Sequence, residues 1–208
     1  MHLTFFYDYS SPFAYLGSLG VEALAREHDA ELHWHPFLLG ALFKAIGTPM
    51  VPVAAMAPAK ADLYKKDMLR WAAHREADFT FPSRFPMNTV KALRMTLQVE
   101  PSDVPRLSHA LFRAYWSQDQ DINDDAVLKG IADDLDLDGG ALLAGTQNPE
   151  VKDRLRAHTD AAVAAGVPGA PSFLVRRSPD DSDGMLFWGQ DRFELIGRAL
   201  GGWRPDCG

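Results

Sequence analysis

A serine followed by a proline marks the first point in the chain where chemistry is expected. The segment FYDYSSPFAYLG, residues 5–16, places Ser11 and Pro12 directly after an apolar and aromatic run. A serine at an N-cap accepts a backbone N–H of the first helical turn, and proline suits the first helical position because no N–H is needed there. The same helix N-terminus offers free N–H donors and the positive end of the helix dipole, which stabilise a thiolate, a phosphate or a carboxylate. The segment therefore has two interpretations, a helix cap and an anion site.

Other patterns that resemble known sites are incomplete. His33 and His35 fall on one face of an expected strand, but no third ligand is evident, so no metal site is predicted. The segment DLDLDG, residues 134–139, matches the start of a calcium loop, yet the twelfth position is Gly145 instead of glutamate. The chain has no Gly-rich phosphate-binding motif, and Ser11 lacks the histidine and aspartate pattern of a hydrolase.

Composition narrows the class of protein. The chain has 208 residues, 47% of them hydrophobic, which is enough for one sizeable core. A net charge of −7 and the lack of a visible basic patch argue against a nucleic-acid binder. No window reaches the roughly 20 apolar residues of a membrane span, and the first residues do not resemble a secretory signal. Cys207 is the only cysteine, so an intramolecular disulfide is impossible and a cytoplasmic location is expected.

The periodicity of apolar residues predicts the elements that position Ser11. Residues 2–7 are typical of a strand, residues 12–28 of a helix, and the segment ELHWHPF from residue 31 of a second strand. This order predicts a parallel βαβ unit. The proline-rich stretch GTPMVPVAAMAP then predicts an ordered loop, and about a hundred residues of helical periodicity follow it.

Strand character returns near the end of the chain. The segments PSFLVR, residues 171–176, and GMLFWG, residues 184–189, predict a hairpin. Asp191 and Glu194 have the spacing of a capping box, which predicts a final helix that ends near Gly201. We therefore expect an α/β protein with one domain. Its β-α-β and β-β-α parts, residues 1–45 and 167–208, would flank an all-helical insertion over residues 58–166.

This order of elements resembles a thioredoxin-like fold. The residues Ser11-Pro12-Phe13-Ala14 stand where a thioredoxin-like oxidoreductase has Cys-x-x-Cys, and GVPGAPSF, residues 166–173, resembles the loop that faces that motif. The resemblance implies a cis peptide bond before Pro171 and implies that Ala170 presents backbone groups to a bound thiol. Since both cysteines are replaced, a disulfide oxidoreductase is not expected.

The whole chain resembles the 2-hydroxychromene-2-carboxylate isomerases, relatives of kappa-class glutathione transferases within the DsbA-like superfamily. The motifs that match are FYDYSSPFAYLG, FLLGALFKAIG, PAKADLYKKDMLRWA, FPSRFPMNTVKALR, GVPGAPSF and FWGQDRFELI. The resemblance implies a glutathione-dependent cis–trans isomerase of aromatic catabolism, a small aromatic substrate and a homodimer. A kappa-like glutathione transferase or peroxidase is the alternative within enzymes, and a redox-inactive thioredoxin-like binding protein is the alternative outside them.

The resemblance also assigns residues to glutathione. Ser11 would lie beside its sulfur, because a hydroxyl can donate a charge-assisted hydrogen bond to a thiolate. Gln190 and Asp191 would hold its γ-glutamyl end, although the capping box explains Asp191 equally well. Lys60 would approach its glycine carboxylate, whereas by its position alone Lys60 is a solvated surface lysine. Thr48 lies where the family often carries an asparagine, so one polar contact has no clear counterpart.

The remaining assignments concern the aromatic substrate. Lys44 is a candidate cation for negative charge that develops on the substrate. Asn88 is a helix cap by its position, and the resemblance places it on the substrate side. Phe43 and Phe85 are candidate walls for a flat ring, and the further wall candidates are Met50, Trp71 and Met87.

Overall fold

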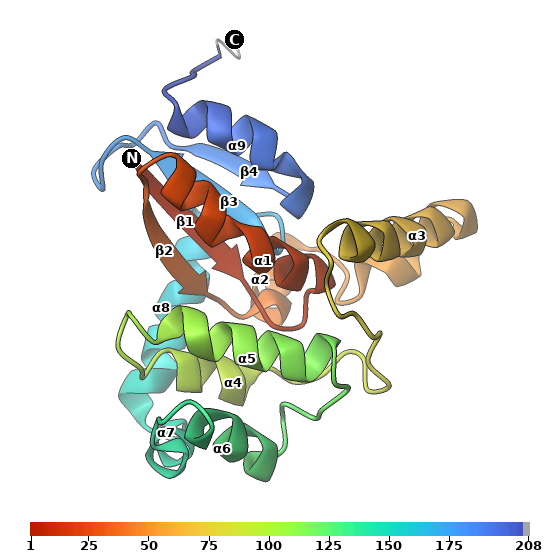
Figure 1. Cartoon of the computed structure of the whole chain (residues 1–208), viewed down its shortest axis with the longest axis vertical. Coiled ribbons are helices and arrows are strands. Elements are labelled where there is room, and N and C mark those ends of the chain that lie inside the picture. The colour runs from red at the N-terminus through yellow and green to blue at the C-terminus, as the bar shows by residue number, and fades with distance from the viewer. Residues whose placement is uncertain (206–208) are drawn as a thin grey trace.

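The computed structural model describes residues 1–205, so Cys207 lies outside the described residues. Within this range the strands form one sheet in the order β2-β1-β3-β4 (Figure 1). The strands are β1 (His2–Tyr7), β2 (Glu31–Pro36), β3 (Ser172–Arg176) and β4 (Met185–Trp188). β1 pairs in parallel with β2 and antiparallel with β3, and β3 pairs antiparallel with β4. The predicted βαβ unit and the terminal hairpin are both confirmed.

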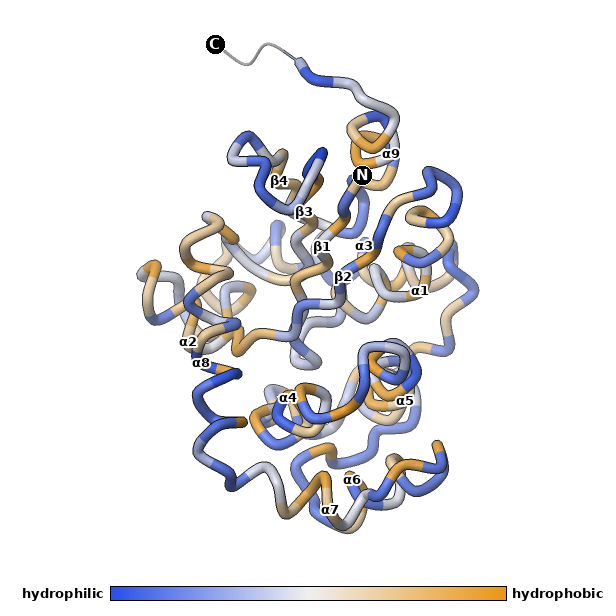
Figure 2. The backbone as a smooth tube through the Cα atoms, turned by 90° about the vertical axis from the view of Figure 1, so that its left-hand side faces the viewer, coloured by the Kyte–Doolittle hydropathy of each residue, from blue (hydrophilic) through white to orange (hydrophobic). Residues whose placement is uncertain are grey.

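Helices cover both faces of the sheet. Figure 2 shows α1 (Pro12–Glu27) and α9 (Phe193–Leu200) on one side and α2 (Leu39–Ile46) and α8 (Pro149–Ala164) on the other. Alternation along β1 explains the two layers, because successive side chains point to opposite faces. Phe5 belongs to the larger apolar cluster that includes α1, whereas Phe6 joins the cluster formed with α2 and α8.

The chain between β2 and β3 is helical. After α2 and a 3₁₀ helix, η1 (Pro52–Ala55), α3 (Pro58–His74) projects to the side of the molecule (Figure 1). Below the sheet lie α4 (Val90–Thr96), α5 (Val104–Trp116), α6 (Asp125–Asp133) and α7 (Gly139–Gly145). The predicted thioredoxin-like fold with a large helical insertion is thus confirmed. No helix within residues 1–205 is both long enough and apolar enough to cross a bilayer.

Buried tyrosines join β1 to the helices below it. The Tyr7 hydroxyl lies 2.7 Å from the Ser108 hydroxyl, and the Tyr9 hydroxyl lies 2.6 Å from that of Thr96. Trp116 donates its indole N–H to the carbonyl of Tyr9 at 2.7 Å. Burial raises the pKa of Tyr9 to about 12, so the phenol stays protonated and remains able to donate. These bonds fix the end of β1, from which the Ser11 loop leaves.

Candidate functional site

Ser11 acts as the N-cap of α1 and also reaches across to another loop. Its backbone is extended, with φ −99° and ψ 117°, and its Oγ accepts the N–H of Ala14 at 3.2 Å. The same hydroxyl donates its proton to the carbonyl oxygen of Ala170 at 2.8 Å. The cap interpretation is therefore confirmed. The proton of the hydroxyl, however, points toward the loop where a bound thiol is expected, and the lone pairs serve the helix.

The loop that receives this bond contains a cis peptide bond between Ala170 and Pro171, as the resemblance implied. The carbonyl of Pro171 accepts the N–H of Gly189 at 3.0 Å, which fixes the segment after β4 beside the loop. Gly189 has φ 110°, a left-handed conformation that favours glycine. The Ser11 loop, the cis-proline loop and the segment after β4 thus converge at one end of the sheet.

Gly17 allows α1 to pack closely on these loops. A Cβ built at Gly17 would lie 3.4 Å from the Cβ of Gln190 and 3.5 Å from both Pro171 Cγ and Phe173 Cζ. These are ordinary van der Waals distances, so a methyl group fits and a longer side chain does not. Gly17 therefore sets the distance between α1 and the two segments that face Ser11.

Asp8, directly after β1, holds the Ser11 loop through hydrogen bonds. The sequence analysis did not select this residue. Its carboxylate is 1% exposed and accepts three hydrogen bonds, from Ser10 N at 2.9 Å, from Thr89 Oγ1 at 2.8 Å and from Leu39 N at 2.8 Å. Burial raises the pKa of Asp8, and the three donors oppose that rise. The carboxylate thereby joins the Ser11 loop to the starts of α2 and α4. The sequence signal that could have identified Asp8 is an acidic residue directly after the apolar strand of residues 2–7.

Gln190 is almost fully buried and is held by Arg75, a second residue that the sequence analysis missed. The Arg75 guanidinium donates to the Gln190 carbonyl oxygen at 3.3 Å and lies over the Phe193 ring at 4.5 Å. Burial lowers the pKa of Arg75, but an arginine stays charged in proteins. Arg75 also lines an open groove of about 900 Å³ between α1 and α9, whose lining does not include Ser11 or Ala170. Gln190 therefore has a structural anchor that links it to α3.

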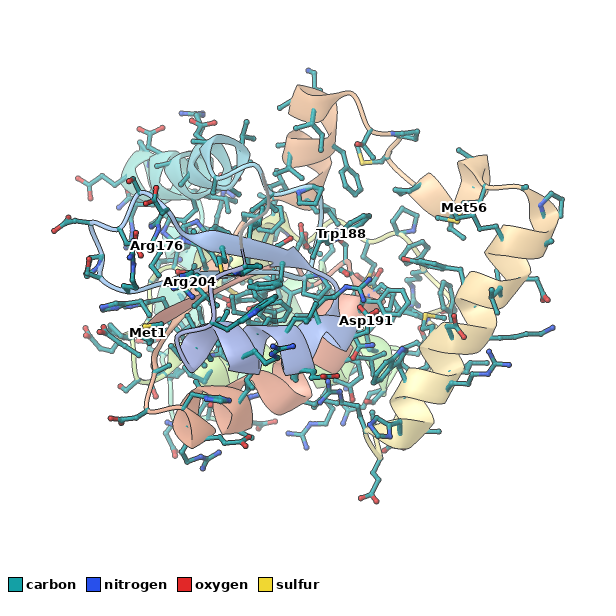
Figure 3. All side chains as sticks on the ribbon, turned by 90° about the horizontal axis from the view of Figure 1, so that it is seen from above. Met1, Met56, Arg176, Trp188, Asp191 and Arg204 are labelled. Carbon is teal, nitrogen blue, oxygen red and sulfur yellow. The ribbon has the colours of Figure 1, made fainter. Side chains whose placement is uncertain are left out.

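Asp191 is exposed and does not cap α9, so the predicted capping box is wrong. A 3₁₀ turn, η2 (Gln190–Arg192), precedes the helix, and the N-cap is Arg192, with no side-chain capping bond. The Asp191 carboxylate lies 3.3 Å from the Arg192 guanidinium. Figures 1 and 3 show that α9 begins at its end nearest α3, where Figure 3 labels Asp191. The carboxylate therefore has no role in the start of α9.

Trp188 is a third residue that the sequence analysis did not select. Its side chain is 59% exposed at the end of β4, and Figure 3 shows it near Asp191 in that view. A Cβ built at Gly169 would lie 3.1 Å from the indole nitrogen, so the ring lies over the segment just before Ala170. A large exposed aromatic ring beside this loop is suited to contact a bound molecule.

Lys60 lies in the first turn of α3 and is exposed. One turn later, Tyr64 packs edge-to-face on Phe13 with ring centroids 5.0 Å apart. Side chains four residues apart share a helix face, so Lys60 and Tyr64 lie on the same side of α3. This contact brings the Lys60 face of α3 to the first turn of α1, next to Ser11.

The expected substrate residues occupy different surroundings. Asn88 accepts the N–H of Val90 at 3.0 Å and directly precedes Thr89, which binds Asp8. Phe85 is partly buried, and its ring centroid lies 5.1 Å from that of Phe81. The other expected substrate residues are Phe43 (7% exposed, within the α2 and α8 cluster), Lys44 (exposed in the last turn of α2), Met50 (62% exposed), and Trp71 and Met87 (partly buried).

The structure thus brings some predicted residues together and separates others. Direct contacts join Ser11, Ala170 and Pro171, and packing around Gly17 adds Gln190. α2, which carries Phe43 and Lys44, is joined to the Ser11 loop at its first residue, Leu39, through Asp8.

Comparison with known proteins supports this description. The family model of the DSBA-like thioredoxin domain matches residues 2–201. The 2-hydroxychromene-2-carboxylate isomerase of Sphingobium xenophagum is 27% identical over 194 residues, 93% of this chain and 95% of that protein. Glutathione S-transferase kappa 1 of Rattus norvegicus is 29% identical and aligns over 96% of this chain and 90% of its own.

A solved structure agrees with the fold. That of selenomethionine 2-hydroxychromene-2-carboxylate isomerase superposes with a TM-score of 0.83 at 21% identity, over 97% of this chain and 95% of the other. The family model and the relatives confirm the resemblance read from the sequence motifs, and the solved structure confirms the fold. Since the family model covers nearly the whole chain, this protein belongs to the family of DSBA-like thioredoxin domains.

Proposed function

We propose that this protein is a glutathione-dependent enzyme that converts 2-hydroxychromene-2-carboxylate to trans-o-hydroxybenzylidenepyruvate. The observation that carries the proposal is the 2.8 Å bond from Ser11 to Ala170, which lies beside cis-Pro171 at the N-terminus of α1. This is the position of the active cysteine in thioredoxin-like oxidoreductases, and here it holds a hydroxyl. A thiol at this point must therefore come from a bound molecule. The isomerase and transferase relatives support glutathione as that molecule.

The groups around Ser11 fit the chemistry of glutathione. The tripeptide carries a thiol, an ammonium group and two carboxylates, and the site offers the Ser11 hydroxyl, the Asp191 carboxylate and the Lys60 ammonium. Asp191 is exposed and has no role as a helix cap, so its carboxylate, which lies beside the Arg192 guanidinium, can also accept from an ammonium group. Lys60 is exposed on the face of α3 that meets the first turn of α1.

Two residues have more constrained roles. Gln190 is 2% exposed and bonded to Arg75, so it offers a ligand little surface and serves mainly to hold the segment before Asp191. Ser11 must turn its hydroxyl proton from Ala170 toward the sulfur. The bond that its Oγ accepts from Ala14 can persist during this rotation, since that bond uses a lone pair. Proton redirection therefore leaves the cap of α1 intact.

The reaction needs a nucleophile that adds and leaves without net oxidation. When bound, glutathione would supply the nucleophile: once the hemiketal C–O bond of the chromene has opened to a phenol and a ketone conjugated with the alkene, reversible addition of the thiolate to that alkene would allow the cis–trans change with no net oxidation. Ser11 donates its hydroxyl proton as a hydrogen bond to the sulfur, and the first-turn N–H groups of α1 favour the anion. In the proposal, Lys44 faces the negative charge on the pyruvoyl end and Asn88 and Phe85 border the aromatic ring. Phe43, which is buried in the cluster of α2 and α8, would hold α2 in place behind them.

The same thiolate site would also serve a kappa-like transferase, and the 29% identity to the rat enzyme supports that second candidate. The proposal further includes a cytoplasmic location and a homodimer. Leu63 and Leu69 on α3 are 52% and 57% exposed, which is suited to burial against a second copy. Light scattering on the purified protein would measure the mass of the assembly.

The proposal is tested by activity with and without the thiol. Dialysed protein should not accelerate isomerisation of the chromene, and added glutathione should restore turnover. A generic aromatic electrophile, assayed in parallel, distinguishes the transferase: conjugation of that compound without isomerisation would favour the second candidate. If the protein neither binds immobilised glutathione nor accelerates either reaction, both enzyme functions are wrong and a redox-inactive binding protein is favoured.

A further inference from the structure

Three side chains with metal-binding atoms meet at the other end of the sheet from Ser11. His2 begins β1, and its partner in the parallel register is Glu31, the first residue of β2. His33 follows two residues later on β2 and therefore points to the same face as Glu31. Among residues 1–205, these three form the only group of three or more histidine, cysteine, aspartate or glutamate residues whose ligand atoms all lie within 4.8 Å of one another.

The distances within this group are those of a coordination polyhedron. His2 Nδ1 lies 3.4 Å from His33 Nε2 and 3.2 Å from Glu31 Oε2, and His33 Nε2 lies 3.2 Å from Glu31 Oε1. Zinc binds imidazole nitrogen and carboxylate oxygen at about 2.0–2.2 Å with tetrahedral geometry, which places neighbouring ligand atoms about 3.3–3.6 Å apart. The separations between the two histidine nitrogens and the carboxylate are therefore close to those between three corners of such a tetrahedron, with His2 and His33 each facing a different oxygen of Glu31.

We propose that His2, Glu31 and His33 bind one divalent transition-metal ion, with Zn²⁺ as the best match. Two imidazoles and a carboxylate suit zinc, copper and nickel better than magnesium or calcium, which prefer oxygen ligands. The carboxylate carries one negative charge to offset the charge of the cation. His33 and Glu31 have side chains that are 47% and 62% exposed, so water completes the fourth position.

The position of the site indicates its role. The groove that includes His33 contains neither His2 nor Glu31. The ion would instead link the first residue of β1 to the start of β2. A ligand that binds only the folded chain stabilises it by mass action, so the ion would stabilise the sheet edge. β1 separates this site from Ser11 by roughly 20 Å, at about 3.4 Å per residue.

This arrangement differs from the pairing that the sequence suggested. His35 shares a strand face with His33 but packs on His158, with ring centroids 4.2 Å apart and its Nε2 3.0 Å from the His158 carbonyl oxygen. The additional ligands for His33 come instead from the start of its own strand and from the neighbouring strand, which are 2 and 31 residues away. The earlier expectation that no metal is bound is replaced by this proposal.

The experiment uses untagged full-length protein that carries Cys207→Ser, which removes the only thiol that could bind the same ions. Calorimetric titration with Zn²⁺ should give one equivalent, and Co²⁺ should give the intense visible absorption of a tetrahedral site. His33→Gln should weaken binding by more than about 100-fold, since even outer-shell partners of a metal contribute about 10- to 100-fold. Glu31→Gln should weaken it as well, and Zn²⁺ should raise the unfolding temperature only where the three ligands are intact.

The matched control is His74→Gln, which removes an exposed histidine from α3 and leaves the three ligands unchanged. It should bind Zn²⁺ like the parent protein. Circular dichroism verifies that each variant is folded. Binding that survives His33→Gln, or that is lost equally in His74→Gln, overturns the assignment. A titration that shows no saturable equivalent on the folded parent protein overturns the site altogether.

Discussion

The hydroxyl of Ser11 and the carbonyl of Ala170, 159 residues apart in the chain, are joined by a hydrogen bond of 2.8 Å. This bond connects the N-terminus of α1 to the cis-proline loop, the two segments that face a sulfur in the proposed reaction. It also shows that one side chain performs two tasks, because the same oxygen caps the helix. The structural and catalytic contributions of Ser11 can therefore be measured separately.

Ser11→Ala should lower turnover by about 100- to 1,000-fold, the usual effect of removing one donor to a developing or stabilised anion. Its free energy of unfolding should fall by only about 1 kcal/mol, the usual value of an N-cap. Isomerase kinetics and urea unfolding measure the two effects. Asn148→Ala is the matched control, since it removes the N-cap of α8, whose side chain accepts Glu150 N at 2.9 Å. That variant should lose similar stability and keep its turnover.

Asp8→Asn should destabilise the protein by about 1–3 kcal/mol, because one of the three N–H or O–H donors would then face an NH₂ group. Urea unfolding near neutral pH measures the loss. An unchanged midpoint would show that the carboxylate does not hold the Ser11 loop.

Asp8 should also give stability a defined pH dependence. Burial raises its pKa in the folded state above the unfolded value of about 3.9. Between these two pKa values the folded state binds more protons, so this group makes the free energy of unfolding fall as the pH rises. The advantage of wild type over Asp8→Asn should therefore shrink across that window, from about pH 4 upward. A difference in the free energy of unfolding between wild type and Asp8→Asn that stays constant with pH would contradict the raised pKa.

Lys60→Ala should raise the KM for glutathione more than it lowers kcat, because the lysine is assigned to the distant glycine carboxylate and not to the reacting atoms. A loss of about 5- to 10-fold corresponds to one exposed charge pair of about 1 kcal/mol. Steady-state kinetics with varied glutathione separate the two parameters. Lys65→Ala, an exposed lysine elsewhere on α3, is the control. If both variants raise the KM for glutathione equally, Lys60 contributes only through the general surface charge and does not bind the glycine carboxylate.

Gly17→Ala should fold at least as well as wild type, since a methyl group fits at 3.4–3.5 Å from its neighbours and alanine favours a helix by up to about 1 kcal/mol. Gly17→Leu should instead displace Pro171 and Gln190 and lower both stability and turnover. Thermal unfolding and activity together test this pair. Normal turnover in Gly17→Leu would show that the distance between α1 and the cis-proline loop does not control the site.

Sequence patterns predicted the parts of the site that depend on neighbouring residues. The strand before Ser11, the cap and the proline at the first helical position all follow from local preferences, and the structure confirms them. The cis bond before Pro171 followed from the family resemblance and not from the residues themselves, because most X–Pro bonds are trans.

The residues that were missed act over long separations. Asp8 accepts from Leu39 and Thr89, which are 31 and 81 residues away, and Arg75 reaches Gln190 across 115 residues. No local pattern indicates such contacts. Asp191 shows the opposite error: its spacing to Glu194 fits a capping box, but a 3₁₀ turn in the chain shifts the start of α9 to Phe193.

The central claim is that the N-terminus of α1 and the cis-proline loop hold a sulfur anion that belongs to a bound tripeptide. Ultraviolet absorbance of the thiolate, followed against pH with glutathione bound, tests it most directly. A free thiol has a pKa of about 8.5, and the bound thiol should ionise at least about one pH unit lower on wild type, with much of that shift lost in Ser11→Ala. A bound thiol that ionises at the same pH as free glutathione would contradict the claim.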